Sequence, residues 1–204
     1  MKKTIYFTLT VAALIFTGCA KEPQYIGDGS GSSVAPVTMG IDRGDFEKAA
    51  MEATESLLSS GALNRPGGGR YVVAIDQVIN DTTQRIDTDL LIKKIRIAML
   101  KSGKAVVTSA IQVGGAESTL SHSVRDLRDN DEINQKTVAK KGTMIAPDMG
   151  LSGKIIQRNA KTHKGDQLVE YYFQLTLTEL ASGLAFWEDE IVVGKLGSNK
   201  TVSW

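Results

Sequence analysis

The chain has 204 residues, with 24 Lys and Arg against 23 Asp and Glu, and a single cysteine, Cys19. A net charge of +1 provides no bulk attraction for nucleic acid. One cysteine cannot form a disulfide within the chain, so the folded part must be stabilised by its hydrophobic core alone.

The first 18 residues have the layout of a secretory signal. Lys2 and Lys3 precede a mostly apolar run, 5–16, which is followed by a pair of small residues. Because about 12 helical residues rise only about 18 Å, the run is too short for a bilayer core of roughly 30 Å. Residues 1–18 are therefore predicted to be a signal peptide that is removed, which takes away two lysines and leaves a charge of about −1.

Cys19 follows this segment directly. A lone cysteine is an inert buried thiol, a reactive nucleophile or a modified residue. Its polar, glycine-rich flank offers no core, and a nucleophile would need a positioned base. The stretch Phe16-Thr17-Gly18-Cys19 resembles the lipobox of bacterial lipoproteins, so Cys19 is predicted to carry acyl chains such as palmitate. Ala20, where Asp would retain the protein, implies by the same resemblance the periplasmic face of the outer membrane of a Gram-negative cell.

Composition divides the mature chain into two parts. Residues 19–41 are rich in Gly, Ser and Pro without a sustained period, which predicts a flexible tether. Residues 42–204 have the length of one domain and are predicted to form a single globular unit.

Two helices and two strands are predicted at the start of the domain. Asp42 is expected to cap a helix whose apolar residues recur at helical spacing as far as a stop at Gly61. The β-branched run 71–79 predicts a buried strand, and a second amphipathic helix ends at Ser102-Gly103 before a short strand at 105–108. Strand, helix and strand in this order predict a βαβ-like unit with parallel strands.

The middle of the chain, 110–147, is less regular. Leu120, Val124 and Leu127 favour a helix, and the segment 137–142 is interpreted as a continuation of helix as far as Gly142. The charges of this region fit a solvated helical face or a partner-binding surface, and the sequence leaves both interpretations open.

The last third predicts three consecutive strands. Segment 150–157 is strand-like, and apolar residues alternate strictly over 169–177 after a turn at 162–166. A turn at 181–183 leads into a third strand, 184–193. The predicted fold class is therefore α/β, an α+β sandwich with a mixed, largely antiparallel sheet covered by helices and a C-terminal β-meander.

Candidate chemical groups are few and scattered. His122 and His163 have no metal-ligating residue at a suitable spacing. Asp76 is interpreted as a strand residue on the wetter face of a sheet, and strand alternation sends the neighbouring carboxylates of 187–190 to opposite faces. Without a catalytic motif we expect no enzyme activity, no catalytic residue, no metal site and no cofactor.

Three segments resemble one family. The run 72–107 resembles the signature of the LpoB family, lipoproteins that activate penicillin-binding proteins, in which a strand ends in an Asn-rich turn before a helix that closes at Ser-Gly-Lys, here Ser102-Gly103-Lys104. Segments 146–155 and 171–187 are similar to a later strand and the closing hairpin of that family. The N-terminal domain of TolB and the curli-export lipoprotein CsgG share the last two patterns more loosely.

The resemblance implies an outer-membrane lipoprotein that binds a class A penicillin-binding protein and stimulates peptidoglycan synthesis, and with it cell-wall growth and cell shape. It implies no chemistry by the lipoprotein and places no partner-contact residue in this sequence. The alternative is a subunit of an envelope assembly or secretion complex resembling CsgG, which a stable ring of many copies in sedimentation analysis would indicate.

Overall fold

The structure is a computed structural model that describes residues 38–111, 117–162 and 164–198. Residues 37–204 belong to one compact unit. The predicted signal peptide, the lipidation site Cys19 and most of the predicted tether lie outside the described residues.

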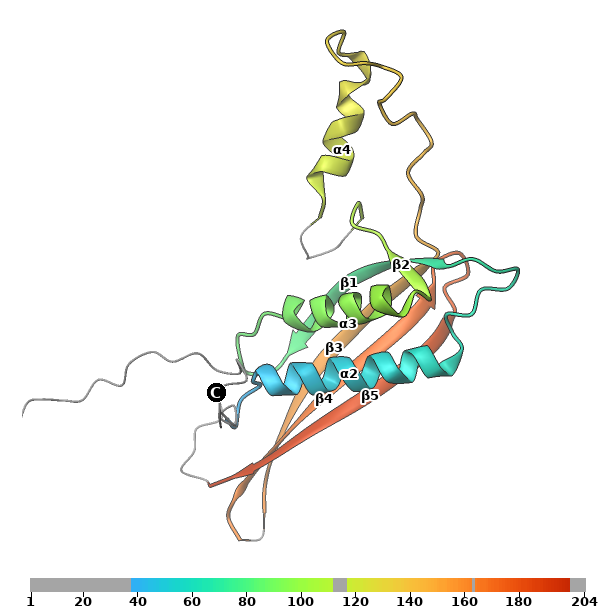
Figure 1. Ribbon diagram of the computed structural model, residues 1–204. Helices are drawn as coiled ribbons and strands as arrows, with labels where there is room; N and C mark the ends of the chain where they lie inside the picture. Colours follow the sequence, from blue (N-terminus) through green and yellow to red (C-terminus); the bar gives the residue numbers. More distant parts are fainter. Residues whose placement is uncertain (1–37, 112–116, 163, 199–204) are drawn as a thin grey trace, which may run out of the picture. The chain divides into compact units, whose positions relative to one another are not determined.

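A five-stranded mixed sheet forms the centre of the unit. Its strands follow the order β2-β1-β3-β4-β5 (Figure 1). Strand β1 pairs in parallel with both β2 and β3, while β3–β4 and β4–β5 are the longer, antiparallel ladders. The predicted βαβ-like unit and C-terminal meander are therefore confirmed. The strands are β1 Tyr71–Asp81, β2 Ala105–Val107, β3 Met149–Lys161, β4 Gln167–Glu179 and β5 Ala185–Gly197.

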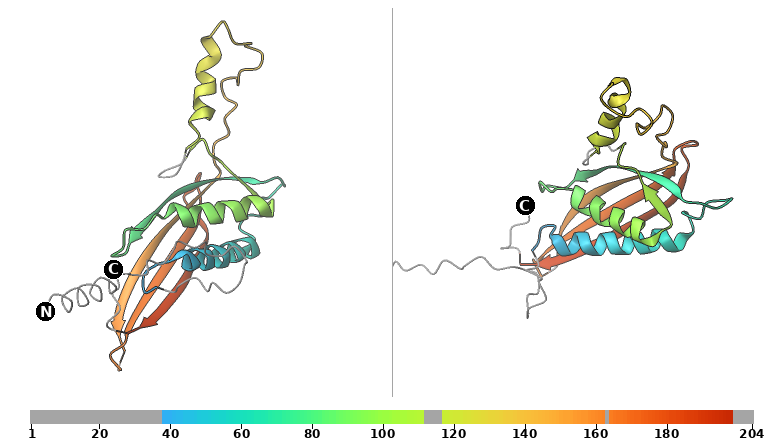
Figure 2. Two further views of the ribbon diagram at one scale, coloured as in Figure 1. Left: turned by 60° about the vertical axis from the view of Figure 1, so that its left-hand side comes forward. Right: turned by 45° about the horizontal axis from the view of Figure 1, so that its top comes forward.

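Two helices, α2 (Arg43–Ser60) and α3 (Asp89–Ser102), lie side by side on one face of this sheet (Figures 1 and 2). As predicted, Asp42 caps α2, and its carboxylate and that of Asp45 form a reciprocal capping box that satisfies free backbone N–H groups. Gly61 ends α2 in the left-handed conformation, with φ 82°, which glycine adopts without steric cost.

Strand alternation decides which face of the sheet is buried. On β4, the alternating residues Val169, Tyr171, Phe173, Leu175 and Leu177 all point into the core under the helices. Their neighbours along the strand point to the opposite face, as the period of two requires. No helix among the described residues packs on that second face, which we call the uncovered face.

A cluster of buried and half-buried polar side chains lies at the start of the folded unit, and we call it the Lys195 cluster: Lys195, Asp42, Asp45, Tyr171 and Gln84. The Lys195 ammonium contacts both carboxylates and donates to the Gly40 carbonyl at 2.6 Å. The Tyr171 hydroxyl accepts from Gln84 Nε2 and donates to the backbone carbonyl of residue 39. Burial would raise the pKa of Asp42, but the hydrogen bond from Lys195 and its charge hold that pKa below its ordinary value.

The region before β3 contains helix α4 (Thr119–Asp126) and a short 3-10 helix, η2 (Leu127–Asp129). This confirms the helix predicted from Leu120, Val124 and Leu127, although α4 buries no side chain.

The interpretation of 137–142 as helix is wrong. The chain forms turns after η2 because side chains compete for the backbone: the N–H of Glu132 donates to Asn130 Oδ1, and that of Lys136 donates to Asn134 Oδ1. None of the helices formed by described residues is long and apolar enough to cross a membrane.

Candidate functional site

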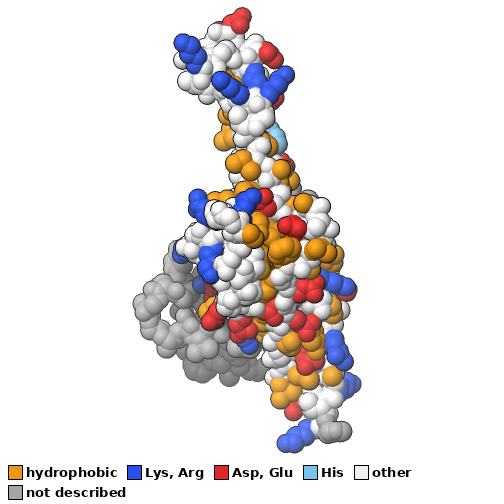
Figure 3. All heavy atoms as spheres, turned by 90° about the vertical axis from the view of Figure 1, so that its right-hand side faces the viewer, with side chains coloured by type: hydrophobic (Ala, Val, Ile, Leu, Met, Phe, Trp, Pro, Cys, Tyr) orange, Lys and Arg blue, Asp and Glu red, His pale blue; other side chains and the backbone are white. Residues whose placement is uncertain are grey.

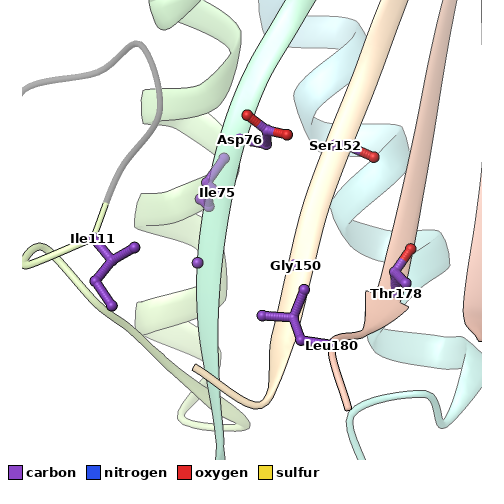
Figure 4. Close-up of a pocket in the computed structure, with 8 residues that line it drawn as sticks. Ile75, Asp76, Ile111, Gly150, Ser152, Thr178 and Leu180 are labelled. Carbon is purple, nitrogen blue, oxygen red and sulfur yellow. The ribbon is translucent and has the colours of Figure 1, made fainter. Parts of the chain in front are cut away.

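A groove lies on the uncovered face, at the end of the sheet where β3 begins. Its volume is about 320 Å³, and its lining is mostly apolar. In Figure 4, Ile111 lies beside β1 and Leu180 lies beside β3, while Asp76 and Ser152 lie further along these two strands. The groove is lined by Ala74, Ile75 and Asp76 of β1, Ile111, Gly150 and Ser152 of β3, Thr178 of β4, and Leu180.

Gly150 and Leu180 pack closely against each other in the lining of the groove. A Cβ atom at this position would lie only 3.0 Å from Leu180 Cδ2, so Leu180 occupies the space above the glycine. The backbone N–H of Leu180 donates to the Asp148 carbonyl at 2.9 Å. The Asp148 carboxylate in turn accepts from the Val72 N–H at 2.8 Å and pairs with Arg65. The wall formed by Leu180 is thus fixed by bonds to neighbouring segments.

Large apolar side chains near the groove are exposed to solvent. Leu180 is 49% exposed and Ile111 is 42% exposed. On the turn and the strand that follow β4, Leu184 and Phe186 are also exposed. Scattered exposed leucines need no explanation, but exposed apolar side chains beside a groove make it a candidate binding surface.

Three carboxylates lie on or near this apolar surface, and we call them the rim carboxylates: Asp76, which lines the groove, and Glu188 and Glu190 on β5, which line a second hollow. Glu188 accepts from the Thr176 hydroxyl, and Glu190 accepts from the Gln174 amide. Within the described residues, none of the three forms an ion pair. Acidic and hydrophobic side chains lie next to one another in the middle of the face shown in Figure 3.

The sheet register places the rim carboxylates relative to the groove. Ser152, Thr176 and Glu188 lie opposite one another in the row next to the groove, and Lys154, Gln174 and Glu190 form the row after it. Lys154 is the cation within these two rows, and it pairs with Asp81 at 2.7 Å. The groove is therefore bordered by negative charge that the cation of its own rows does not neutralise.

The residues singled out in the sequence do not meet at one site. Asp76 is exposed, as predicted, and lies on the groove, while the alternation predicted for 187–190 is confirmed because Trp187 is buried and Glu188 is exposed. His122 lies on α4, where its Nε2 is 2.9 Å from Glu117. His163 lies outside the described residues.

This arrangement offers a surface for binding but brings no reactive groups together in the groove. The groove contains one carboxylate and two hydroxyl side chains, Ser152 and Thr178, with no imidazole, amine or thiol among its lining residues. Within the part of the chain that the structure describes, no three His, Cys, Asp or Glu side chains are grouped so that they could hold a metal ion.

The sequence signal for this site was weak. Its lining residues come from four separate segments, and each of them has an ordinary structural explanation when it is considered alone. The combination that indicates the groove is a glycine in a strand, Gly150, at the position where another segment approaches closely.

Comparisons with known proteins place the fold in a family. The family model described as peptidoglycan-synthase activator LpoB matches residues 45–193. No curated protein sequence matches the chain significantly.

Two solved structures illustrate the similarity. The LpoB C-terminal domain from Salmonella enterica has 14% identity, a TM-score of 0.42, and covers 73% of this chain and 98% of its own. The NMR structure of Escherichia coli LpoB has 13% identity, a TM-score of 0.38, and covers 86% of this chain and 82% of its own. Because the family model spans most of the folded unit, from α2 to β5, the chain belongs to the LpoB family of peptidoglycan-synthase activators.

Proposed function

We propose that this protein is an outer-membrane lipoprotein that binds and activates a class A penicillin-binding protein. The observation that carries the proposal is the match of residues 45–193 to a family of peptidoglycan-synthase activators. The lipobox-like sequence that ends at Cys19 supports the location, since a lipid anchor would hold the domain on the periplasmic face of the outer membrane.

The activation follows from binding alone in this proposal. A ligand that prefers the active conformation of a synthase shifts the population toward that conformation by as much as its affinities for the two states differ. The candidate chemical groups support a role without catalysis, because Asp76 and His122 lie on different elements and share no described contact. We therefore propose that the lipoprotein is not an enzyme and needs no cofactor.

The tether limits how far the domain can act from the membrane. Since Met39 is buried in the core, the folded unit begins before residue 42, and about 18 residues remain between Cys19 and the fold. As a coil this segment would span about 23 Å, and fully extended it would reach about 60 Å. The proposal therefore requires that the start of the folded unit lies within about 60 Å of the outer membrane when the synthase is bound.

The first test measures binding and stimulation together. Residues 37–204, which form a compact unit with their own core, are mixed with a purified class A penicillin-binding protein from the same cell. We expect capture of the synthase and faster glycan polymerisation from lipid-linked precursor. If the domain neither captured nor stimulated any class A synthase of that cell, the proposed function would be refuted.

The second test concerns the anchor. Cys19→Ala removes the only thiol of the chain, so we expect no acylation with radiolabelled palmitate and loss of activity in cells. The purified domain should bind the synthase unchanged. A processed Cys19→Ala protein that still fractionates with the outer membrane would contradict the lipidation.

A further inference from the structure

We propose that the groove binds one protruding segment of a partner protein in which a large apolar side chain lies between Lys or Arg side chains. This inference rests on the proposed function only in taking the synthase as the source of the segment. The groove supplies the site for the apolar side chain, and the rim carboxylates supply partners for the cations.

The size of the groove favours a side chain as the occupant. At about 320 Å³ it lies at the lower end of the range of roughly 300–1,000 Å³ typical of small-molecule sites. Its polar groups, Asp76, Ser152 and Thr178, lie among apolar neighbours. Such a pocket accepts the single apolar anchor that commonly dominates a protein interface.

The charges around the groove determine what flanks that anchor. Asp76 borders it on β1, and Glu188 and Glu190 lie across the sheet on β5. Lys154 already pairs with Asp81 at 2.7 Å, so it does not neutralise them. A partner with Lys or Arg on both sides of its apolar residue would find a carboxylate on either side, which steers association and fixes the register of the segment.

The same charges disfavour other occupants. An anionic membrane surface or a nucleic acid would meet uncompensated carboxylates, which repel it. A second copy that inserted a different surface into the groove would make a head-to-tail contact, which continues into rings or filaments. A different protein that binds the groove forms a complex that does not propagate in this way.

The chemistry of the segment is tested directly with short capped peptides. Residues 37–204, labelled with ¹⁵N, are titrated with Lys-Leu-Lys, Glu-Leu-Glu and Lys-Gly-Lys while amide shifts are recorded. We expect Lys-Leu-Lys to shift the amides of Ala74, Gly150 and Leu180 most, at concentrations where the other two peptides leave them unchanged. Equal shifts with Glu-Leu-Glu, or no shift near the groove, would overturn the inference.

Matched variants then test the groove in the complex with the synthase. Leu180→Glu places a charge in the apolar wall, and Asp76→Lys reverses a rim charge. The control for Leu180→Glu is Leu196→Glu, at an exposed leucine near the far end of β5. The control for Asp76→Lys is Glu55→Lys on the exposed surface of α2. We expect each groove variant to weaken binding about thirtyfold or more, the size of an interface hot spot, while the controls stay within about threefold of wild type.

The two proposals fail in different ways. If Leu180→Glu and Asp76→Lys bound the synthase as tightly as wild type, the inference about the groove would be overturned and the proposed function would stand. Peptide shifts at the groove without binding of any class A synthase would keep the groove and refute that function. Concentration-dependent self-association in sedimentation that Leu180→Glu abolishes would show a second copy in the groove and overturn the inference.

Discussion

At the end of the sheet where β5 finishes, Lys195 is buried and contacts two carboxylates, whereas near the start of the same strand Glu188 and Glu190 reach solvent. In the Lys195 cluster each buried charge has a partner, because an unpaired charge in the core would cost several kcal/mol. The rim carboxylates have no ion pair among the described residues, and they are exposed to water.

This difference separates stability from binding within one sheet. Groups that hold the fold are satisfied internally and are expensive to change. Groups that are solvated contribute little to folding, and they can change without loss of the domain. Substitutions at the two ends of the sheet should therefore differ in their effect on stability.

The largest effect is expected from Lys195→Met. Methionine fills a similar volume but leaves Asp42 and Asp45 without the buried cation, which costs about 3–5 kcal/mol of the free energy of unfolding. Urea denaturation of residues 37–204 measures it. The control is Lys93→Met, since Lys93 is exposed on α3. A loss below about 1 kcal/mol would show that Lys195 is better hydrated than its contacts indicate.

A second strong effect is expected from Gly153→Ala in β3. The added Cβ would lie 2.6 Å from Leu175 Cδ2 and 2.8 Å from the Gln174 carbonyl oxygen, and the backbone atom cannot move aside. Overpacking of this kind costs about 1–3 kcal/mol. The matched control is Gly194→Ala on β5, where no atom lies within 4 Å of the new Cβ. Equal thermal melting of the two variants would contradict this account.

The sequence predicted the elements that depend on local pattern. Asp42 and Gly61 bound α2 through capping chemistry, and the alternation from Val169 to Leu177 gives both the strand and its buried face. These signals lie within one turn or one strand. The interpretation of 137–142 as helix was wrong because the side chains of Asn130 and Asn134, just before this segment, accept hydrogen bonds from the backbone and favour turns.

Long-range contacts could not be predicted in this way. In the sequence, Lys195 resembles an exposed lysine at the end of a strand. It is buried because Gly40 and Asp42, which lie 155 and 153 positions earlier in the chain, fold onto β5. The groove likewise needs β1, β3 and the residue after β4 to meet. Asp76 was correctly predicted to face solvent, but its position on a groove follows from the register of β1 with β3.

Acid is expected to lower the stability of the Lys195 cluster and of helix α2. The pKa of Asp42 is lowered by Lys195 against the opposing effect of burial, and hydrogen bonds from Arg43 and Lys94 lower the pKa of Glu47. A lowered pKa means that the folded state binds fewer protons, so its stabilisation is full above the ordinary carboxyl pKa, about 4, and is lost as pH falls through that value to the lowered one. The melting temperature should therefore fall as the pH drops below the ordinary carboxyl pKa of about 4.

The double variant Asp42→Asn, Glu47→Gln tests the origin of that fall. It lacks both carboxyl groups, so its melting temperature should decline less steeply over the same pH range. A decline as steep as that of wild type would assign the acid sensitivity to other groups.

The smallest effect is expected at the groove itself. Leu180→Ser shortens an exposed side chain that lies over Gly150, and it keeps the backbone bond from residue 180 to the Asp148 carbonyl. The free energy of unfolding should change by no more than about 0.5 kcal/mol, as at most surface positions. Leu177→Ser, three residues earlier on β4, is fully buried and is expected to cost several times more. If urea denaturation gave both variants the same loss, the wall of the groove would be part of the core, and the separation between the stabilising and the binding ends of the sheet would be lost.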